Sequence, residues 1–138
     1  MFRLGKSILV DADPLIALGL PRDKHHARAI SFAQANTAAL VTTWPVITEA
    51  AHFLKSDKRR LLELVRSGAL IVEEVKRDDM PRMLALIDKY PQADLADASL
   101  VLVGERLGIT DVATVDVADF SIYRTLTGRA FRNVFPAY

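Results

Sequence analysis

Short apolar runs alternate along the chain with longer segments whose apolar residues recur at helical spacing. Apolar runs bounded by polar or turn residues predict buried strands, and apolar residues at every third or fourth position predict helices that bury one face. Strands are predicted at residues 8–10, 39–41, 70–72 and 112–115, with a fifth candidate at 131–135. Helices are predicted at residues 14–18, 25–35, 45–54, 57–66, 79–90 and 95–107.

Strands that alternate with helices indicate the α/β fold class, with a parallel sheet covered by helices on both faces. The spacing also predicts which residues two of the helices bury. The inward residues of helix 45–54 are predicted to be Val46, Ile47, Ala50, Phe53 and Leu54. Those of helix 57–66 are predicted to be Leu61, Leu62, Leu64 and Val65.

Length and composition indicate an ordinary globular protein. A chain of 138 residues is long enough to bury a core, and we expect one domain over residues 1–138. Hydrophobic residues make up 51% and charged residues 25%, which is not the composition of a disordered chain. The net charge of +1 argues neither for nor against a nucleic-acid partner.

The absence of cysteine excludes disulfides, thiolate metal sites and cysteine nucleophiles, and it fits a reducing cytosol. The apolar run near the amino end is too short for a signal peptide. The longest uncharged stretch, residues 29–48, contains too many polar residues for a membrane span. We therefore expect a cytoplasmic protein with no membrane partner.

Four acidic residues lie at the edges of apolar segments: Asp11 after SILV, Glu49 in TTWPVITEAAHFL, Asp97 in DLADASLVLVGERLG and Asp116 in VATVDVADF. An ionised acid is costly to bury without a partner. No basic residue is embedded among the four, so a bound cation is the expected partner. Clustered carboxylates suit hard cations such as Mg²⁺ or Mn²⁺.

The predicted strands place two of these acids at the same edge of the sheet. Asp11 directly follows the first predicted strand and Asp116 directly follows the fourth. Ligands of open parallel sheets bind outside the carboxyl ends of the strands. The sequence therefore predicts a site at this edge.

Each acid also has an explanation that needs no metal. Asp11 can cap the helix that follows it, and Glu49 can lie on a solvated helix rim. Asp94 is favoured as a helix cap, whereas Asp97 lies on the same helix face three residues later. Asp116 stands at a turn, where aspartate is common. Only the four acids taken together favour a metal site.

The basic residues and histidines carry less information. His25 and His26 are expected to be exposed, and His52 beside Glu49 does not make a zinc site. The run KSDKRR is typical of a solvated helix start, with contact to phosphates as the alternative. Its basic residues are Lys55, Lys58, Arg59 and Arg60.

The order of these segments resembles a PIN domain, specifically the VapC-type toxin ribonucleases of bacterial and archaeal toxin–antitoxin pairs. The resemblance runs nearly end to end, through ILVDADPLIAL, DKHHARAISF, TTWPVITEAAHFL, YPQADLADASLVLVGERLG and ATVDVADF. It implies a PIN-like three-layer α/β/α sandwich with a short central parallel sheet.

The resemblance also implies an activity, which is hydrolysis of RNA phosphodiester bonds by water activated on Mg²⁺ or Mn²⁺. The family's acids carry over onto Asp11, Glu49, Asp97 and Asp116, with Glu49 as a ligand or a base. Thr114 matches the family's hydroxyl near the first carboxylate. The auxiliary candidates are Thr114, Asp94, Asp119 and Asp13. The implied partners are RNA, the cognate antitoxin of a type II pair and a second copy of the chain.

Asp13 departs from the family, which more often has a small or hydroxylated residue at this position. The sequence ILVDAD also resembles the Asp-x-Asp motif of haloacid-dehalogenase-type phosphohydrolases, with Asp11 as the nucleophile. That family expects Gly-Thr or similar after the second aspartate, where Pro14 and Leu15 stand here. It also expects a later lysine at a strand end, and we see none. The phosphohydrolase remains the alternative interpretation.

A response-regulator receiver is a third α/β class of this size. It needs an aspartate at the end of the third strand and a lysine at the end of a later one. The third predicted strand leads into Glu73, Glu74 and Val75, and ATVDVADF has no lysine. We therefore reject the receiver.

Overall fold

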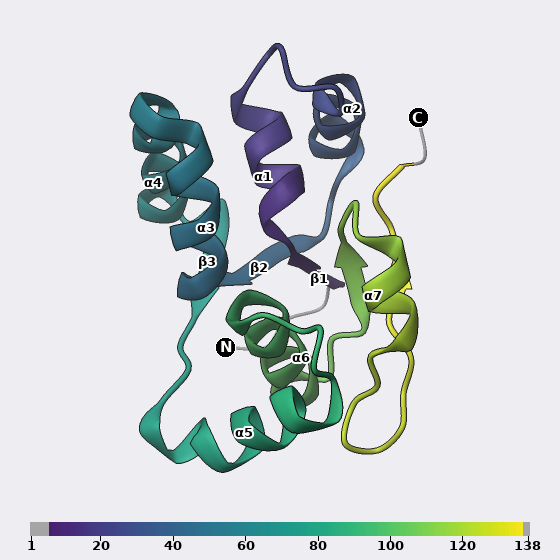
Figure 1. Cartoon of the computed structure of the whole chain (residues 1–138). Helices are drawn as coiled ribbons and strands as arrows, with labels where there is room; N and C mark the ends of the chain where they lie inside the picture. The colour runs from purple at the N-terminus through teal and green to yellow at the C-terminus, as the bar shows by residue number, and fades with distance from the viewer. Residues whose placement is uncertain (1–5, 137–138) are drawn as a thin grey trace.

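The computed structural model describes residues 6–136 and has an α/β fold. A five-stranded sheet with strand order β3-β2-β1-β4-β5 forms its centre, and every neighbouring pair is parallel (Figure 1). The strands are β1 (Ser7–Val10), β2 (Ala39–Thr43), β3 (Leu70–Glu73), β4 (Asp111–Ala113) and β5 (Arg132–Asn133). The predicted fold class and parallel sheet are confirmed, and the fifth candidate strand is present with two residues.

Helices flank the sheet and account for every helix predicted from the sequence. They are α1 (Ala12–Gly19), α2 (His26–Ala35), α3 (Trp44–Leu54), α4 (Lys58–Ser67), α5 (Met80–Lys89), α6 (Leu95–Leu107) and α7 (Val117–Ile122). In the view of Figure 1, α1 to α4 lie above the strands, and α5 and α6 lie below them. Short 3-10 turns at Lys55–Asp57 and Arg77–Asp79 precede α4 and α5.

Helix α7 was not predicted. It is six residues long, and Phe120 is its one buried residue, so its segment has no apolar stripe that a periodicity argument could detect. The interpretation of this segment as a turn is therefore wrong beyond Asp116, whose side chain caps the helix.

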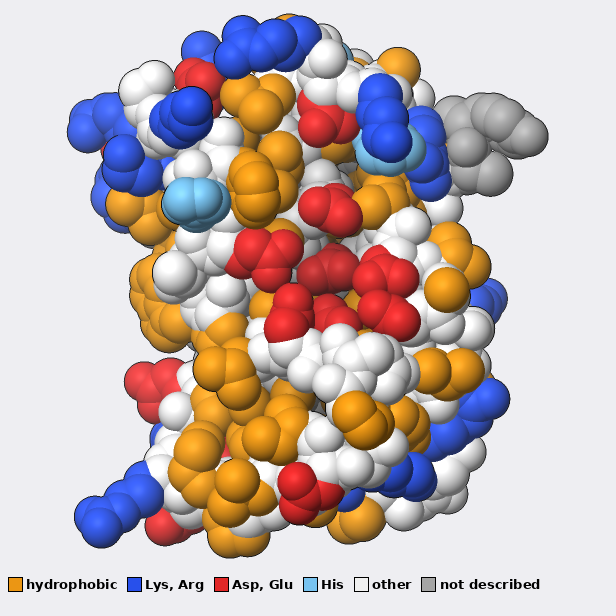
Figure 2. Space-filling view, viewed as in Figure 1, with side chains coloured by type: hydrophobic (Ala, Val, Ile, Leu, Met, Phe, Trp, Pro, Cys, Tyr) orange, Lys and Arg blue, Asp and Glu red, His pale blue; other side chains and the backbone are white. Residues whose placement is uncertain are grey.

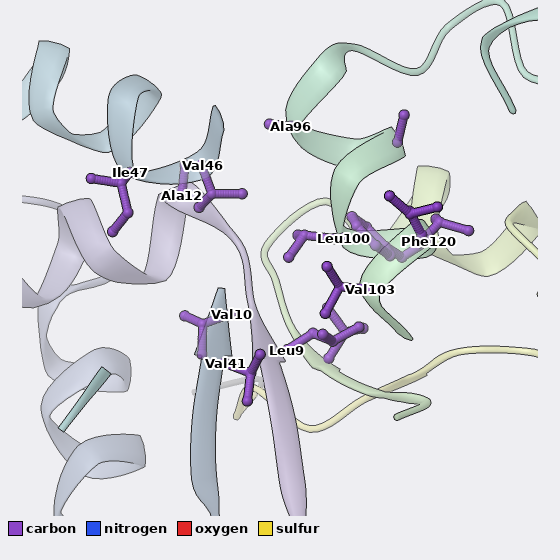
Figure 3. Close-up of a cluster of buried hydrophobic side chains, with 14 of the residues drawn as sticks. Leu9, Val10, Ala12, Val41, Val46, Ile47, Ala96, Leu100, Val103 and Phe120 are labelled. Atoms are coloured by element: carbon purple, nitrogen blue, oxygen red, sulfur yellow. The ribbon is translucent and has the colours of Figure 1, made fainter. Parts of the chain in front are cut away.

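The core centres on β1 and α6 (Figure 3). Leu9 and Val10 of β1 are buried, and α6 is buried continuously from Ala96 to Gly104. A helix that is apolar all round belongs in an interior. Gly104 permits this packing because a Cβ there would lie 2.7 Å from the carbonyl oxygen of Ile109.

Two residues predicted to face inward are exposed. Phe53 of α3 is 56% exposed and Leu62 of α4 is 48% exposed. Both lie directly beside a residue that is buried, Leu54 and Leu61 respectively. The buried face of α3 is formed by Val46, Ile47, Ala50 and Leu54, and Phe53 lies at its margin; in α4 only Leu61 is buried.

The expected exposure of His25 and His26 is also wrong. Both are partly buried, and the Nδ1 atom of His26 lies 2.7 Å from the carbonyl oxygen of Ala17. Helices α1 and α2 pack against each other, so the loop between them is drawn against α1.

No helix within residues 6–136 has the length and apolar character that crossing a bilayer requires. Residues 1–5, part of the amino-terminal segment that was weighed against a signal peptide, lie outside the described residues.

Candidate active site

The topology places a crevice at the carboxyl ends of β1 and β4. From β1 the chain continues to β2 on one side, while β4 pairs with β1 on the other side. Connections that leave in opposite directions open a crevice at this edge, which is where such sheets bind ligands. Asp11 directly follows β1, as predicted. Asp116 follows β4 after Thr114 and Val115, because strand pairing ends at Ala113 rather than at the predicted residue 115.

Acidic side chains gather in the middle of the face above this edge (Figure 2). The carboxyl groups lie close together, and neighbouring carboxylates contribute to the raised pKa values of Asp11, Glu49, Asp97 and Asp119. We call the following residues the acidic cluster: Asp11, Asp13, Glu49, Asp94, Asp97, Asp116 and Asp119. The structure thus brings together the four acids predicted as the site and the three auxiliary acids.

Asp97, Asp116 and Asp119 form the tightest group in the acidic cluster. Each offers one carboxylate oxygen, and these three atoms lie within 4.8 Å of one another. Asp119 was predicted only as an auxiliary acid, yet it lies closer to Asp97 and Asp116 than the sequence indicated. The first turn of α7 explains this, because the side chain of Asp116 caps the helix by accepting a hydrogen bond from the Asp119 backbone (3.2 Å).

Asp11 is held by hydrogen bonds to both carboxylate oxygens. The backbone N–H of Ala12 donates to Oδ1 (2.8 Å), and the hydroxyl of Thr114 donates to Oδ2 (2.8 Å). The same Thr114 oxygen accepts from the backbone N–H of Asp116 (2.9 Å). Thr114 therefore ties the ends of β1 and β4 together, and its hydroxyl lies where the resemblance implied.

Asp97 lies in the first turn of α6, with two supporting contacts. Its backbone N–H donates to Asp94 Oδ1 (2.8 Å), so Asp94 is the helix cap that the sequence predicted. Its Oδ2 atom accepts a hydrogen bond from the hydroxyl of Tyr123 (2.7 Å). Burial, together with the hydrogen bond to Asp97, raises the pKa of Tyr123 well above its usual value. Tyr123 therefore remains a hydroxyl donor at any physiological pH.

Burial is the main cause of raised pKa values in the acidic cluster. It raises the pKa of Asp11 to about 6, and that of Glu49 and of Asp97 to about 7, with further increases from neighbouring carboxylates. The hydrogen bonds from Thr114 and Tyr123 oppose this for Asp11 and Asp97. Asp11, Glu49 and Asp97 therefore retain protons more strongly than exposed acids do.

The pKa values of two other acids of the cluster are also raised. The pKa of Asp13 is raised mainly by partial desolvation of its carboxyl group at the protein surface, and then by the charges of Asp23 and Asp116. The pKa of Asp119 is raised mainly by a hydrogen bond to the Asp116 carboxyl group. These two acids therefore also lose their protons less readily than free aspartates do.

Among the described residues no acid of the cluster forms an ion pair, and the nearby His25 and Lys24 partly oppose the raised pKa of Asp13 alone. The amino ends of α1 and α6 supply partial positive charge, but these dipoles are weak beside several carboxylates. An all-oxygen ligand set with excess negative charge fits a hard divalent cation such as Mg²⁺ or Mn²⁺.

Three polar residues around the cluster were not identified from the sequence. Tyr123 contacts Asp97, as described above. The side chain of Asn133 donates to the Thr114 carbonyl (3.1 Å) and accepts from the Thr114 N–H (3.2 Å). The hydroxyl of Ser99 lies 2.6 Å from that of Thr43 and ties α6 to the end of β2. Buried hydroxyls of this kind need partners, but a sequence does not say which partner each one meets.

Comparisons with known proteins identify the fold. No protein-family model matches the sequence, and no significant match to a curated protein was found. Among solved structures, Mycobacterium tuberculosis VapC20, a Sarcin-Ricin loop cleaving toxin, superposes with a TM-score of 0.80 at 20% identity, covering 94% of this chain and 99% of that chain. A chain of a toxin–antitoxin complex from Klebsiella pneumoniae superposes with a TM-score of 0.65 at 18% identity, covering 83% of this chain and 91% of that chain.

The likeness to VapC20 spans nearly the whole of both molecules. It agrees with the helix-flanked parallel sheet described above. The chain therefore has the PIN-like fold of the VapC toxins.

Proposed function

We propose that the chain is a divalent-metal-dependent ribonuclease that hydrolyses RNA phosphodiester bonds with a metal-activated water. The observation that carries this proposal is the acidic cluster at the crevice of the sheet, none of whose acids forms an ion pair within residues 6–136. The shared fold with a toxin described as cleaving the Sarcin-Ricin loop supports the same activity.

The residues of the cluster have different proposed roles. Asp97, Asp116 and Asp119 would hold the cation, with Asp11 beside them. Bound Mg²⁺ or Mn²⁺ supplies a polarised phosphoryl group and water of lowered pKa. Thr114 keeps Asp11 in place through its 2.8 Å hydrogen bond.

Glu49 is the candidate general base among the acids of the cluster. It is partly exposed on α3, and its pKa is raised to about 7. An acid whose pKa lies near the working pH is deprotonated often enough to accept a proton and basic enough to do so effectively. We assign Glu49 the role of accepting the proton of the attacking water.

We further propose that the protein is the toxin of a type II toxin–antitoxin pair, acting in the cytoplasm as a single domain. The fold likeness to a chain from a toxin–antitoxin complex supports an antitoxin partner. Large apolar side chains follow the capping acids directly: Leu95 after Asp94 is 63% exposed, and Val117 after Asp116 is 57% exposed. A protein partner that covered the acidic cluster would bury both of them.

A second copy of the chain is the other proposed partner. Met80 and Leu84 of α5 are 40% and 57% exposed, and they lie one turn apart on the helix. An exposed apolar helix face of this kind suits a homodimer. Light scattering of the purified chain and of a Leu84→Glu variant tests this, with a dimer expected for the first and a monomer for the second. A monomeric parent protein would contradict the dimer.

The haloacid-dehalogenase-type alternative needs Asp11 as a covalent nucleophile and Asp13 as the general acid–base. The fold likeness to VapC20 spans nearly the whole of both molecules, and Pro14 and Leu15 stand where the haloacid-dehalogenase family expects Gly-Thr or similar. The nuclease is therefore the better supported of the two activities.

Cleavage of a single-stranded RNA tests the proposal against this alternative. With Mn²⁺ we expect RNA to be cleaved, and we expect EDTA or the Asp97→Asn substitution to stop cleavage. A small phosphomonoester, assayed in parallel, should remain intact. Phosphomonoester hydrolysis with intact RNA would replace the nuclease by the phosphohydrolase. RNA cleavage that survives both EDTA and Asp97→Asn would contradict the metal site.

A further inference from the structure

Tyr123 connects the aromatic core directly to the acidic cluster. Its side chain is fully buried, and its hydroxyl donates a 2.7 Å hydrogen bond to Oδ2 of Asp97. Its backbone N–H donates to the carbonyl oxygen of Asp119 (3.3 Å). One residue therefore contacts two of the three acids whose oxygens converge within 4.8 Å.

The ring of Tyr123 is fixed by its neighbours. Tyr90 packs edge to face against it with ring centroids 5.1 Å apart, and Phe120 does the same at 5.1 Å. Phe120 in turn packs against Phe131. The backbone is held as well, because the N–H of Arg124 donates to the hydroxyl of Tyr90 (3.1 Å). The tyrosine hydroxyl is therefore placed by the core rather than by the carboxylate that it meets.

A fixed donor restricts the rotation of the carboxyl group that accepts from it. A carboxyl group turns readily about its last side-chain bond, so an unsupported aspartate samples many orientations. Groups that hydrogen-bond to a metal ligand restrict this freedom and strengthen metal binding. In Asp97 the hydrogen bond occupies one lone pair of Oδ2, which leaves the other lone pairs available to a cation.

We propose that Tyr123 is a positioning residue that orients Asp97 for a divalent cation shared with Asp116 and Asp119. This inference rests on the proposed metal site and adds to it the device that orients one ligand. The competing explanation is that Asp97 merely provides a partner for a buried tyrosine hydroxyl, as buried tyrosines generally require.

The experiment compares Tyr123→Phe with Tyr90→Phe, which removes a hydroxyl from the same aromatic group without touching a carboxylate. Mn²⁺ affinity is measured for both variants and for the parent protein by calorimetry at pH 7.5. We expect Tyr123→Phe to weaken binding about tenfold or more and Tyr90→Phe to change it by less than about twofold. Melting temperatures without metal show how much each hydroxyl contributes to folding alone.

The outcomes separate this inference from the proposed function. If the parent protein binds no Mn²⁺, the proposed metal site itself is contradicted. If the parent protein and both variants bind Mn²⁺ with equal affinity, only the role of Tyr123 is contradicted. A lower melting temperature of Tyr123→Phe with unchanged affinity would make the hydroxyl purely structural.

A second measurement needs no substitution and decides the question if Tyr123→Phe does not fold. The parent protein, labelled with ¹³C at the tyrosine ring carbons, is titrated with Mg²⁺ and followed by NMR. We expect the Cζ resonance of Tyr123 to shift, because its hydrogen-bond acceptor binds the cation, and that of Tyr90 to stay in place. Equal response of the two resonances would contradict the inference.

Discussion

Acidic residues occur in two contrasting settings in this molecule. Away from the crevice, several acids that lie between elements are paired with arginine. The Arg82 guanidinium makes two hydrogen bonds to Glu105 across α5 and α6, and Arg132 pairs with Asp111 at 3.0 Å across β5 and β4. In the acidic cluster no such pair forms among the described residues. The chain therefore neutralises its acids where they join elements and leaves negative charge where the crevice opens.

The acids of the cluster also differ from ordinary exposed acids in their pKa values. Burial raises the pKa of Asp97 to about 7, with further contributions from Asp11, Asp94 and Asp116. Glu105 and Asp111 are paired with arginines, whereas the buried acids of the cluster are not, so an energetic cost remains at this edge. A bound cation would offset that cost, because it favours the ionised carboxylates.

The largest expected effect is loss of RNA cleavage in Asp11→Asn and Asp97→Asn. Each substitution removes a charge from the acidic cluster and should lower the rate about 100-fold or more, the usual cost of removing one preorganised group. Without metal the variants should be at least as stable as the parent protein, because repulsion among carboxylates falls. Cleavage rates with Mn²⁺ and melting curves with EDTA measure the two quantities.

Asp111→Asn is the matched control, because it removes an acid that has an arginine partner. It should leave cleavage unchanged. Full activity together with lower melting temperatures in Asp11→Asn and Asp97→Asn would show that these acids are only helix caps.

Glu105→Gln tests the other side of the comparison. Glu105 accepts two hydrogen bonds from Arg82, and both side chains are largely buried. Loss of the charge should lower the free energy of unfolding by about 1.5–3 kcal/mol, the range for hydrogen bonds to charged groups. Cleavage per folded molecule should not change. Urea unfolding with a parallel RNA assay measures both, and an unchanged unfolding midpoint would contradict the structural role of this pair.

Asp13→Ser should have a smaller effect. Asp13 lies in the first turn of α1, exposed at the margin of the acidic cluster. Because Asp13 is a secondary polar contact, its loss should lower the rate of RNA cleavage at most about tenfold. This corresponds to roughly 1.4 kcal/mol of activation free energy. A loss of several orders of magnitude would instead favour the phosphohydrolase, in which this residue is the general acid–base.

A further expected effect is a trend of stability with pH in the protein without metal. The pKa of Asp97 is raised from 3.8 to about 7, so between these values the folded protein holds a proton that the unfolded chain releases. The free energy of unfolding should therefore fall as pH rises from about 4 to 7, and level off above it.

Asp97→Asn carries no titrating group at this position, so it should lack that part of the trend. Unfolding of both proteins from pH 4 to pH 8 in the presence of a chelator measures the difference between them. A difference that stays constant over this range would show that Asp97 is not perturbed as described.

Much of the fold could be predicted because its elements are long and strongly patterned. Helix α6 begins and ends where the sequence placed it, with Asp94 as its cap and Gly108 as its stop. The acids Asp11 and Asp116 were placed at one edge by the rule for parallel sheets alone. Both predictions rest on local signals that tertiary packing did not override.

Other features depend on contacts between distant segments and could not be predicted. Tyr123 reaches Asp97 across 26 residues of sequence, and Asn133 reaches Thr114 across 19. Phe53 was predicted to face the core from its helical spacing, but α3 buries fewer of its apolar residues than that spacing indicated. Burial and pairing of such residues follow from the packing of whole elements, which no short window of sequence contains.

The most direct test of the account is calorimetric titration of the purified protein with Mn²⁺ at pH 7.5. If the unpaired acidic cluster is a metal site, the parent protein and Asp111→Asn should bind Mn²⁺ with the same affinity, and Asp97→Asn should bind at least about tenfold more weakly. If the parent protein binds no Mn²⁺, or if all three proteins bind it equally, the cluster is not the cation site described here.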